Sequence, residues 1–488
     1  MIRVRARVHD KFSLEFKVWF EKEEISDKHK QNFFRLESWI FLPASLDINA
    51  ITYSREQFYS NIKTYFRTIT PVYSLEELAA RPGTENSGTP SAFLSNAVFN
   101  LINLQSKGNI ADYEYQIKMY CAIFKSAMRE SYNELKTALL QLKKEGGDSG
   151  AGRLVTVFKE RAYAVLEFYH NLSEELKGSV EERLFSEFKL GEEFLINLTE
   201  LYFYKIYGIA GGDAGILRQI EQYKTERGYQ VLRRGAGTEN SNLIYRWNVL
   251  KKYVESDLFL SVDRRKDGVL AEQVYYSIAA GLSMIFATIV SFSFQQKYGN
   301  FTIPFFVALV ISYMLKDRIK ELVRYAFTTN RKLKYFDNKT KLAVKDTVIG
   351  VSKEGFDIVP QQKVPRQIME TRARSYIVET ENSINQENVL FYRNLIVLDG
   401  KKLDSTSDYT IDGINGILFF NFSDFVKKMD NPQIPYFITE GENVSRIMID
   451  KVYYVNLIFQ FSSNSGSYIK RYRIRMNRNG ILGLEEIE

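Results

Sequence analysis

Residues 274–315 read VYYSIAAGLSMIFATIVSFSFQQKYGNFTIPFFVALVISYML, two apolar runs joined by the polar turn 295–300. The first run, 274–294, has no charged residue over 21 positions. At about 1.5 Å per residue, that is long enough to cross a bilayer core of roughly 30 Å. The second run, 301–315, spans only about 22 Å, so it has to include Tyr298 and Gly299, let Lys316 extend to the interface, or thin the bilayer locally. The stretch predicts a transmembrane helical hairpin, with a buried hairpin in a large soluble core as the alternative.

Cationic residues flank this predicted hairpin on both sides. They are Arg264, Arg265 and Lys266 before it, and Lys316, Arg318 and Lys320 after it. The turn between the two runs carries only Lys297. Because Lys and Arg gather on the cytoplasmic side of membrane proteins, we expect two spans with both termini cytoplasmic. We also expect the six flanking side chains to lie at the membrane surface and to bind anionic headgroups.

Small residues recur at a four-residue spacing in both runs. They are Ala279, Ser283, Ala287 and Ser291 in the first run, and Ala308 and Ser312 in the second. Small side chains let helix backbones approach closely in lipid, where apolar side chains gain little by mutual burial. We expect this ridge to pack the two helices together. The alternative is self-association of several hairpins, up to a pore.

The composition limits the chemistry that the chain can perform. Its net charge of +7 gathers beside the hairpin, so anionic lipid explains the charge more simply than nucleic acid does. There is one cysteine, Cys121, and there are three histidines, His9, His29 and His170. The part after His170 therefore cannot by itself build a Ser-His-Asp or Cys-His catalytic unit or the usual zinc site. We expect no catalytic residue, no cofactor and no metal.

Changes in composition and in hydrophobic periodicity divide the chain into segments. The predicted class is an α+β membrane protein with these parts: a small α+β unit at 1–80, a linker at 81–91, a helical cytoplasmic domain at 92–263, the transmembrane hairpin at 270–316, an amphipathic basic stalk at 317–340, and a β-rich cytoplasmic domain at 341–488. The β-rich domain is expected to be a small sandwich or open barrel.

Period-two alternation at 2–8 and 12–20 predicts a β-hairpin, and 34–42 predicts a third strand that ends at Pro43. Ser54 and Gln57 match a capping box, which predicts a helix that places Phe58, Ile62, Tyr65 and Phe66 on one face. In this reading Pro71 ends the helix.

Helical periodicity dominates the segment between Pro90 and Pro304, which contains no proline. Two apolar stripes carry it, one with Ile117, Tyr120, Phe124, Met128, Leu135, Leu139 and Leu142, the other with Val155, Phe158, Ala162, Val165, Tyr169 and Leu172. Cys121 lies beside the first stripe, so we expect a buried, unreactive thiol. A further amphipathic helix, with Leu243, Trp247, Leu250, Val254 and Leu258, is expected to lead into the hairpin.

Four other patterns have both a structural and a functional interpretation. The turns at 146–153 and 211–218 share the pattern GGDxGxxR; they predict helix–turn–helix joints, since a phosphate cradle would need a lysine where Arg153 stands. Asp404, Asp408 and Asp412 lack the spacing of an EF-hand and are expected in turns and caps.

Arg471, Arg473 and Arg475 alternate along one strand and predict a solvated face or a protected sheet edge, with phosphate or headgroup binding as the alternative. His170 has no evident partner in the sequence and is expected in the core or at its boundary.

No catalytic constellation appears beside the predicted hairpin. We therefore expect a non-enzymatic, membrane-anchored cytoplasmic scaffold or sensor that binds an unidentified protein partner and that can form a homo-oligomer. One alternative is an oligomeric effector whose hairpins form a pore gated by the cytoplasmic domains. Another is a carboxylate- and magnesium-dependent enzyme acting near the membrane, which requires a pocket with converging Asp and Glu side chains.

Overall fold

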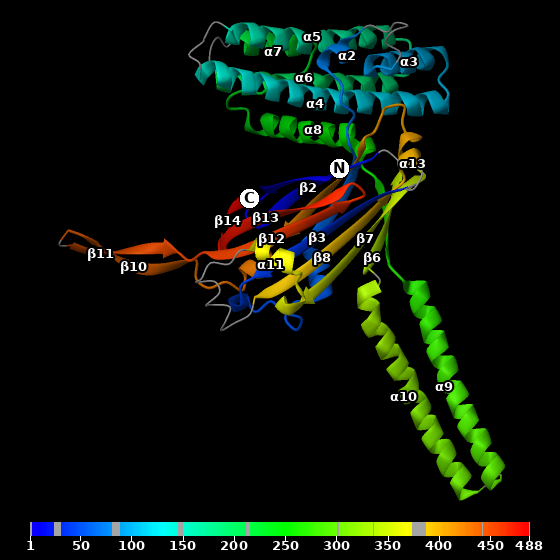
Figure 1. The fold of residues 1–488 in the computed structure, drawn as a ribbon. Coiled ribbons are helices and arrows are strands. Elements are labelled where there is room, and N and C mark those ends of the chain that lie inside the picture. Colours follow the sequence, from blue (N-terminus) through cyan, green and yellow to red (C-terminus); the bar gives the residue numbers. More distant parts are fainter. Residues whose placement is uncertain are drawn as a thin grey trace. The chain divides into compact units, whose positions relative to one another are not determined.

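A computed structural model of the chain describes residues 2–23, 31–80, 88–144, 150–210, 215–299, 302–334, 336–372, 387–441 and 443–487 (Figure 1). The chain forms two compact units, which we call the β unit and the helical unit. The β unit comprises Met1–Phe66, Ser261–Leu403 and Gly413–Glu488; the helical unit comprises Arg67–Leu260 and Asp404–Asp412. Helices and strands are both abundant, which confirms the mixed α and β class.

Two antiparallel sheets make up most of the β unit. The larger sheet has, in spatial order, the strands β14 (Gly480–Ile487), β13 (Gly466–Asn477), β12 (Tyr453–Ser463), β3 (Asn32–Leu42), β8 (Asn388–Leu398), β7 (Thr347–Val359), β6 (Asn338–Val344) and β5 (Ser261–Lys266). The smaller sheet has the order β1 (Ile2–Val8), β2 (Ser13–Glu21), β9 (Gly413–Asn421) and β4 (Ile62–Thr68). A separate ribbon consists of β10 (Gln433–Glu440) and β11 (Asn443–Asp450).

Aromatic side chains pack the two larger sheets against each other. The rings of Phe16 in β2 and Phe459 in β12 meet edge to face with centroids 5.1 Å apart. Phe20 in β2 lies 5.5 Å from Phe34 in β3. All four side chains are buried, so the β unit is a sandwich whose core is rich in aromatic rings.

The N-terminal residues do not form the separate unit that was predicted for 1–80. The hairpin of β1 and β2 forms as expected, with Ile2 opposite Phe20. However, β2 also pairs with β9, and β3 lies between β8 and β12. Strands from both ends of the chain therefore share one sandwich, because a short hairpin cannot bury its apolar face alone. The strands at 34–42 and after residue 341 belong to the same sheet.

The predicted helix after Ser54 is shorter than expected. Ser54 and Gln57 form the capping box, and α1 spans Arg55–Asn61. The prediction that Ile62, Tyr65 and Phe66 continue this helix was wrong, because Ile62–Thr68 is strand β4. β-branched and aromatic residues favour a strand here, and pairing with β9 decides the outcome.

The helical unit is built from long helices around an aromatic core. Its helices are α2 (Leu75–Ala79), α3 (Pro90–Asn103), α4 (Lys107–Lys144), α5 (Ala151–Leu176), α6 (Glu182–Ala210), α7 (Gly215–Glu226) and α8 (Gly237–Glu255). Apart from the partly exposed Leu142 and Val155, every residue of the two predicted stripes is buried, and so is Cys121. Tyr169 stacks on Phe188 at 4.1 Å. A Cβ at Gly191 would collide with the Tyr169 hydroxyl, so the glycine is required where α5 and α6 approach.

One short segment from the C-terminal half belongs to the helical unit. Residues Asp404–Asp412 insert Tyr409, whose ring is buried and whose hydroxyl donates to Gln116 Oε1 at 2.7 Å. Ser407 bonds the hydroxyl of Tyr115 at 2.8 Å. Asp408 Oδ2 accepts a hydrogen bond from Gln116 Nε2 at 3.4 Å. Asp408 therefore helps to hold this segment on α4.

Two predicted boundaries differ from the structure, the end of α8 and the start of the β-rich part. α8 does not run into the hairpin, because strand β5 lies between them. The stalk predicted at 317–340 is, over most of its length, a continuation of the second hairpin helix, α10 (Ile303–Lys334). The β-rich part begins at Asn338, with β6. Most of the predicted linker, the first half of each GGDxGxxR turn, and residues 300 and 301 in the hairpin turn lie outside the described residues.

Candidate membrane hairpin and the polar cluster at its base

Helix α9 (Val269–Tyr298) carries the most apolar segment of the chain. Among the described residues, one helix, Glu272–Tyr298, is long and apolar enough to cross a membrane. Core helices of soluble proteins can be as apolar, but they are mostly buried. In this helix, only 11 % of the most apolar 18-residue stretch is buried. The apolar part of α10, Ile303–Leu315, is followed directly by the charged residues Lys316, Asp317 and Arg318. α10 does not meet the same criterion of length and apolarity. One helix thus gives weak support for membrane association, and the second span stays a prediction.

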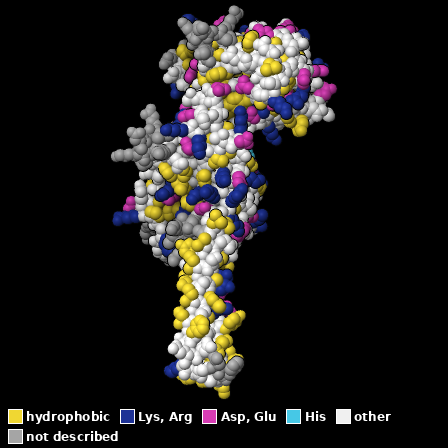
Figure 2. Space-filling view, turned by 90° about the vertical axis from the view of Figure 1, so that its right-hand side faces the viewer, with side chains coloured by type: hydrophobic (Ala, Val, Ile, Leu, Met, Phe, Trp, Pro, Cys, Tyr) yellow, Lys and Arg dark blue, Asp and Glu magenta, His cyan; other side chains and the backbone are white. Residues whose placement is uncertain are grey.

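Large apolar side chains point away from the hairpin on both helices (Figure 2). Within the apolar parts of the two helices, the most exposed at 274–294 of α9 are Val274, Met284, Ile285, Ile289 and Phe292, and the most exposed at 303–315 of α10 are Ile303, Phe306, Tyr313 and Met314. Soluble proteins rarely expose a continuous apolar surface of this extent. Such a surface on a paired helical hairpin suits a hydrocarbon environment.

The small residues lie between the two helices. Ala279 and Ser283 in α9 and Ala308 and Ser312 in α10 are buried, although the large apolar residues around them are exposed. Ser312 Oγ donates to the backbone carbonyl of Ala287 across the helix pair at 3.3 Å. Ser291 is partly buried. Close helix packing through small residues accounts for this arrangement.

Three hydroxyls of α9 bond to the backbone of the helix itself. Ser283 Oγ donates to the carbonyl of Ala280 at 2.8 Å, and Thr288 Oγ1 donates to the carbonyl of Met284 at 2.9 Å. Ser293 bonds Ile289 in the same way. The protons of these three hydroxyl groups are therefore donated to the helix's own carbonyls.

The basic residues beside the hairpin differ in their surroundings. Lys316 lies with its Nζ 4.2 Å from the centroid of the Tyr313 ring, a pairing common at membrane interfaces. Arg318 is exposed and Lys320 is partly exposed. On the other side, Arg265 pairs with Asp263 at 2.9 Å, and Lys266 is exposed on β5.

The hairpin begins and ends at one place in the β unit. The backbone N–H of Asp267, just before α9, donates to the carbonyl of Asp337, just after α10, at 3.2 Å. Strands β5 and β6 continue this pairing, with Lys266 opposite Asn338. Lys353 of β7 adds an ion pair with Asp267 at 3.8 Å. The hairpin is therefore an insertion between two neighbouring strands of the larger sheet.

A buried carboxylate lies beside this base. Glu354 of β7 is nearly inaccessible, and its Oε2 accepts a hydrogen bond from Arg264 at 2.8 Å. Its Oε1 accepts from the hydroxyl of Tyr392 at 2.9 Å and from Thr64 Oγ1 at 3.4 Å. Burial of a carboxylate is costly unless it is paired and hydrogen-bonded, as it is here. Arg264, expected at the membrane surface, thus also pairs with a buried acid.

Asp337 accepts hydrogen bonds from a second set of donors. Arg55 Nη1 donates to its Oδ1 at 2.7 Å, while the hydroxyl of Tyr59 and the backbone N–H of Phe356 donate to its Oδ2 at 2.9 and 2.8 Å. Arg55 also reaches Asp357 at 3.0 Å. Burial, and then the Asp337 charge, raise the pKa of Tyr59 far above its ordinary value, so the hydroxyl stays a donor.

We call Arg55, Tyr59, Arg264, Asp337, Glu354, Asp357 and Tyr392 the base cluster. It links α1, β5, β7, β8 and Asp337, which directly precedes β6. Sequence reasoning found only Arg264 among these residues, because charged residues that come together from distant positions leave no local pattern.

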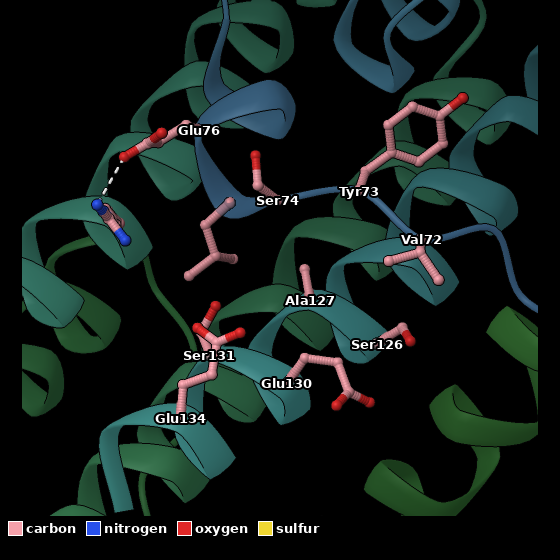
Figure 3. Close-up of a pocket in the computed structure, with 11 residues that line it drawn as sticks. Val72, Tyr73, Ser74, Glu76, Ser126, Ala127, Glu130, Ser131 and Glu134 are labelled. Carbon is pink, nitrogen blue, oxygen red and sulfur yellow. Dashed lines mark ion pairs between the residues drawn. The ribbon is translucent and has the colours of Figure 1, made fainter. Parts of the chain in front are cut away.

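A cavity of about 220 Å³ lies in the helical unit, between α4 and the segment 72–76 (Figure 3). Glu76, Glu130 and Glu134 line it together with Arg161. Glu76 is paired with Arg161 at 2.8 Å, and Glu130 with Arg129 at 2.8 Å. Within the described residues, no three His, Cys, Asp or Glu side chains are close enough to hold a metal ion.

The remaining sequence candidates have structural partners. Arg473 and Arg475 pair with Glu485 of β14 at 2.7 and 3.2 Å. Since β14 lies outside β13, the expectation of a protected edge at β13 was wrong. His170 is partly buried, and its Nδ1 lies 2.8 Å from Glu192, a partner that is distant in sequence and left no local pattern.

These features define a mixed α and β protein with one candidate membrane-spanning helix and a charged cluster where that helix joins the sheet. No protein-family model matches the sequence, and no curated protein and no solved structure matches it either.

Proposed function

We propose that the chain is a non-enzymatic, membrane-anchored scaffold or sensor. In this proposal α9 and α10 cross the bilayer as a two-span hairpin, and the β unit and the helical unit stay on the cytoplasmic side. The observation that carries the proposal is the outward apolar surface of the hairpin, which surrounds a buried ridge of small residues.

The charge distribution supports the orientation. Basic residues precede α9 and follow the apolar part of α10, whereas the described part of the turn has Lys297 as its charged residue. Positive residues favour the cytoplasmic side. Lys316, Arg318 and Lys320 would then meet anionic headgroups, each with about 1 kcal/mol of attraction.

The base cluster supports a role in signal coupling. Asp337 is joined to α1 through Arg55, and Arg264, which lies three residues before Asp267, is joined to the buried Glu354. A shift of either hairpin end would disturb charged pairs that are expensive to leave unpaired. The helical unit supplies a separate surface for a protein partner.

Topology is tested by labelling single cysteines in intact right-side-out cells or vesicles. In a Cys121→Ser background, Lys297→Cys tests the turn, and Ser261→Cys tests the base; both native side chains are exposed. We expect a membrane-impermeant maleimide to label position 297 from outside and position 261 only after permeabilisation. Labelling of both positions from the same side would contradict two spans.

Partner binding and conduction are tested separately. We expect the detergent-purified chain to retain a stable protein partner and to show no turnover of phosphate esters, nucleotides or peptides. Liposomes that contain the chain should hold an ion gradient. A sustained ion leak would instead favour the pore.

A further inference from the structure

The ribbon of β10 and β11 exposes a continuous apolar face. No other described strand pairs with either of its edges (Figure 1). Ile434 lies opposite Ile449, and Tyr436 lies opposite Ile447. Cross-strand partners share a face of the sheet, so these four side chains and Ile438 lie together. A two-stranded ribbon is marginally stable in water, and an exposed apolar patch on it indicates a binding surface.

Backbone geometry identifies the edge that is open for pairing. The N–H of Lys451 donates to the carbonyl of Pro432 at 2.8 Å, so the backbone of Lys451 faces β10. Hydrogen-bonding direction alternates along a strand. Hence Arg446, Met448 and Asp450 direct their N–H and C=O groups to the outer edge of β11.

Two other outer strands in the β unit carry residues that hinder pairing. By the same alternation, Pro435 lies at the outer edge of β10, where it removes a donor. Strand β5, at the end of the larger sheet, carries four charged residues in succession, Asp263–Lys266. The described part of β11 has neither feature, since its charges are confined to Arg446 and Asp450.

We propose that the outer edge of β11 pairs antiparallel with β11 of a second copy of this chain, about a two-fold axis at Met448. Arg446 then lies opposite Asp450 of the other copy, and Asp450 lies opposite Arg446. Met448 meets Met448, and Ile447 meets Ile449. All the outward-directed groups at 446, 448 and 450 find partners, and the two ribbons become one four-stranded sheet.

Charge complementarity selects this register. An axis at Arg446 would place two guanidinium groups face to face, which is unfavourable across strands. An axis at Ile447 would place Arg446 opposite Met448. The axis at Met448 creates two identical Arg446–Asp450 pairs, as isologous association requires. It also doubles the apolar face of Tyr436, Ile447 and Ile449.

The paired segment is short, with five residues from each copy, 446–450. Its interface is smaller than the roughly 1,200 Å² of a stable complex, so we expect weak dimers in dilute solution. Confinement in one membrane would raise the effective concentration and the dimer fraction. The pairing itself depends on β11 alone, so it stands whether or not the hairpin spans the membrane.

Cross-linking of the full chain in detergent tests the register. In the Cys121→Ser background, Met448→Cys places two thiols opposite each other, and a short bismaleimide should join them. Ser445→Cys is the matched control, exposed on the same strand. In this register residue 445 lies opposite residue 451, so two copies of position 445 are about 20 Å apart. We expect at least tenfold more cross-linked dimer at position 448. Equal yields, or monomers at both positions, would overturn the proposal.

A charge exchange tests the ion pairs. Arg446→Asp or Asp450→Arg alone should reduce cross-linking at Met448→Cys by tenfold or more, because like charges then oppose each other. The double variant Arg446→Asp/Asp450→Arg should restore it. Unchanged melting temperatures would show that each variant is folded. Cross-linking that is unchanged by the single substitutions, or that is not restored in the double variant, would contradict this pairing.

Discussion

Asp267 and Asp337 are joined by a backbone hydrogen bond of 3.2 Å, although 69 residues separate them in the chain. Those residues, 268–336, contain the whole of α9 and α10. The strands on either side, β5 and β6, pair as an ordinary antiparallel hairpin. The β unit therefore closes on itself without the helical hairpin.

Excision of the hairpin should leave a folded, water-soluble protein. Replacement of residues 268–336 by Asn-Gly joins Asp267 to Asp337 through a two-residue turn that suits antiparallel strands. We expect this variant to purify without detergent and to keep the circular dichroism of its remaining helices and strands, whereas the full chain requires detergent. A variant that still sediments with membranes would show that another surface binds lipid.

Arg264→Ala should destabilise the β unit more than Arg265→Ala. Arg264 neutralises the buried Glu354, and its loss leaves that carboxylate with Tyr392 and Thr64 as uncharged donors. We expect a loss of about 1–3 kcal/mol in the free energy of unfolding. The Arg265–Asp263 pair is exposed, so its loss should cost less than about 0.5 kcal/mol. Denaturant unfolding of the soluble variant measures both, and equal losses would remove the special role of Arg264.

Ala279→Leu should loosen the hairpin. Ala279 is fully buried between the helices, so a larger side chain forces them apart and costs about 1–3 kcal/mol. The control Ile278→Phe adds bulk at the neighbouring position, which is 49 % exposed. Thermal unfolding in detergent should show a lower melting temperature for Ala279→Leu only. A similar shift in both variants would argue against close packing at Ala279.

The helical unit should lose stability in acid through Glu192. Burial raises the pKa of Glu192, but hydrogen bonds from Lys189, Tyr229 and His170 outweigh it and leave the pKa below its ordinary value of 4.5. A carboxyl whose pKa is lower in the folded state than in the unfolded state stabilises the fold. This contribution is complete at pH values above the unfolded-state pKa, and it is lost as the pH falls through the folded-state pKa. The free energy of unfolding, measured by helical circular dichroism, should fall at pH values below about 4.5. It should fall less in Glu192→Gln.

Orientation in the membrane should follow the flanking charges. A variant that replaces Lys316, Arg318 and Lys320 by Gln, and Gln295 and Gln296 by Lys, moves positive charge to the turn. We expect a fraction of these chains to insert with the turn on the cytoplasmic side. Labelling of Lys297→Cys by the impermeant maleimide should then fall relative to the parent. Unchanged labelling would mean that the large units alone set the orientation.

Local periodicity predicted local structure correctly. The β1–β2 hairpin, the capping box of Ser54, and the buried stripes of α4 and α5 all depend on residues close in sequence. The strand β4 was misassigned because Phe58, Ile62 and Phe66 also fit the spacing of a helix face. Pairing with β9, some 350 residues away, decides between the two.

Long-range pairing could not be read from the sequence. β3 lies between β8 and β12, so strands more than 300 residues apart share the centre of one sheet. The base cluster arises from that sheet, since it brings Arg55, Arg264 and Asp337 together. Only residues of the hairpin itself, such as Ala279 and Lys316, belonged to a local pattern that predicted them.

A fluorophore on the hairpin measures membrane insertion most directly. In the Cys121→Ser background, Ile289→Cys carries an environment-sensitive dye on an exposed position of α9, and Val249→Cys carries it on an exposed position of α8. In lipid vesicles, we predict blue-shifted emission at position 289 that quenchers on the lipid chains reduce and iodide does not. Position 249 should show the reverse. Iodide quenching of position 289 to the same extent as position 249 would contradict an anchor that spans the bilayer.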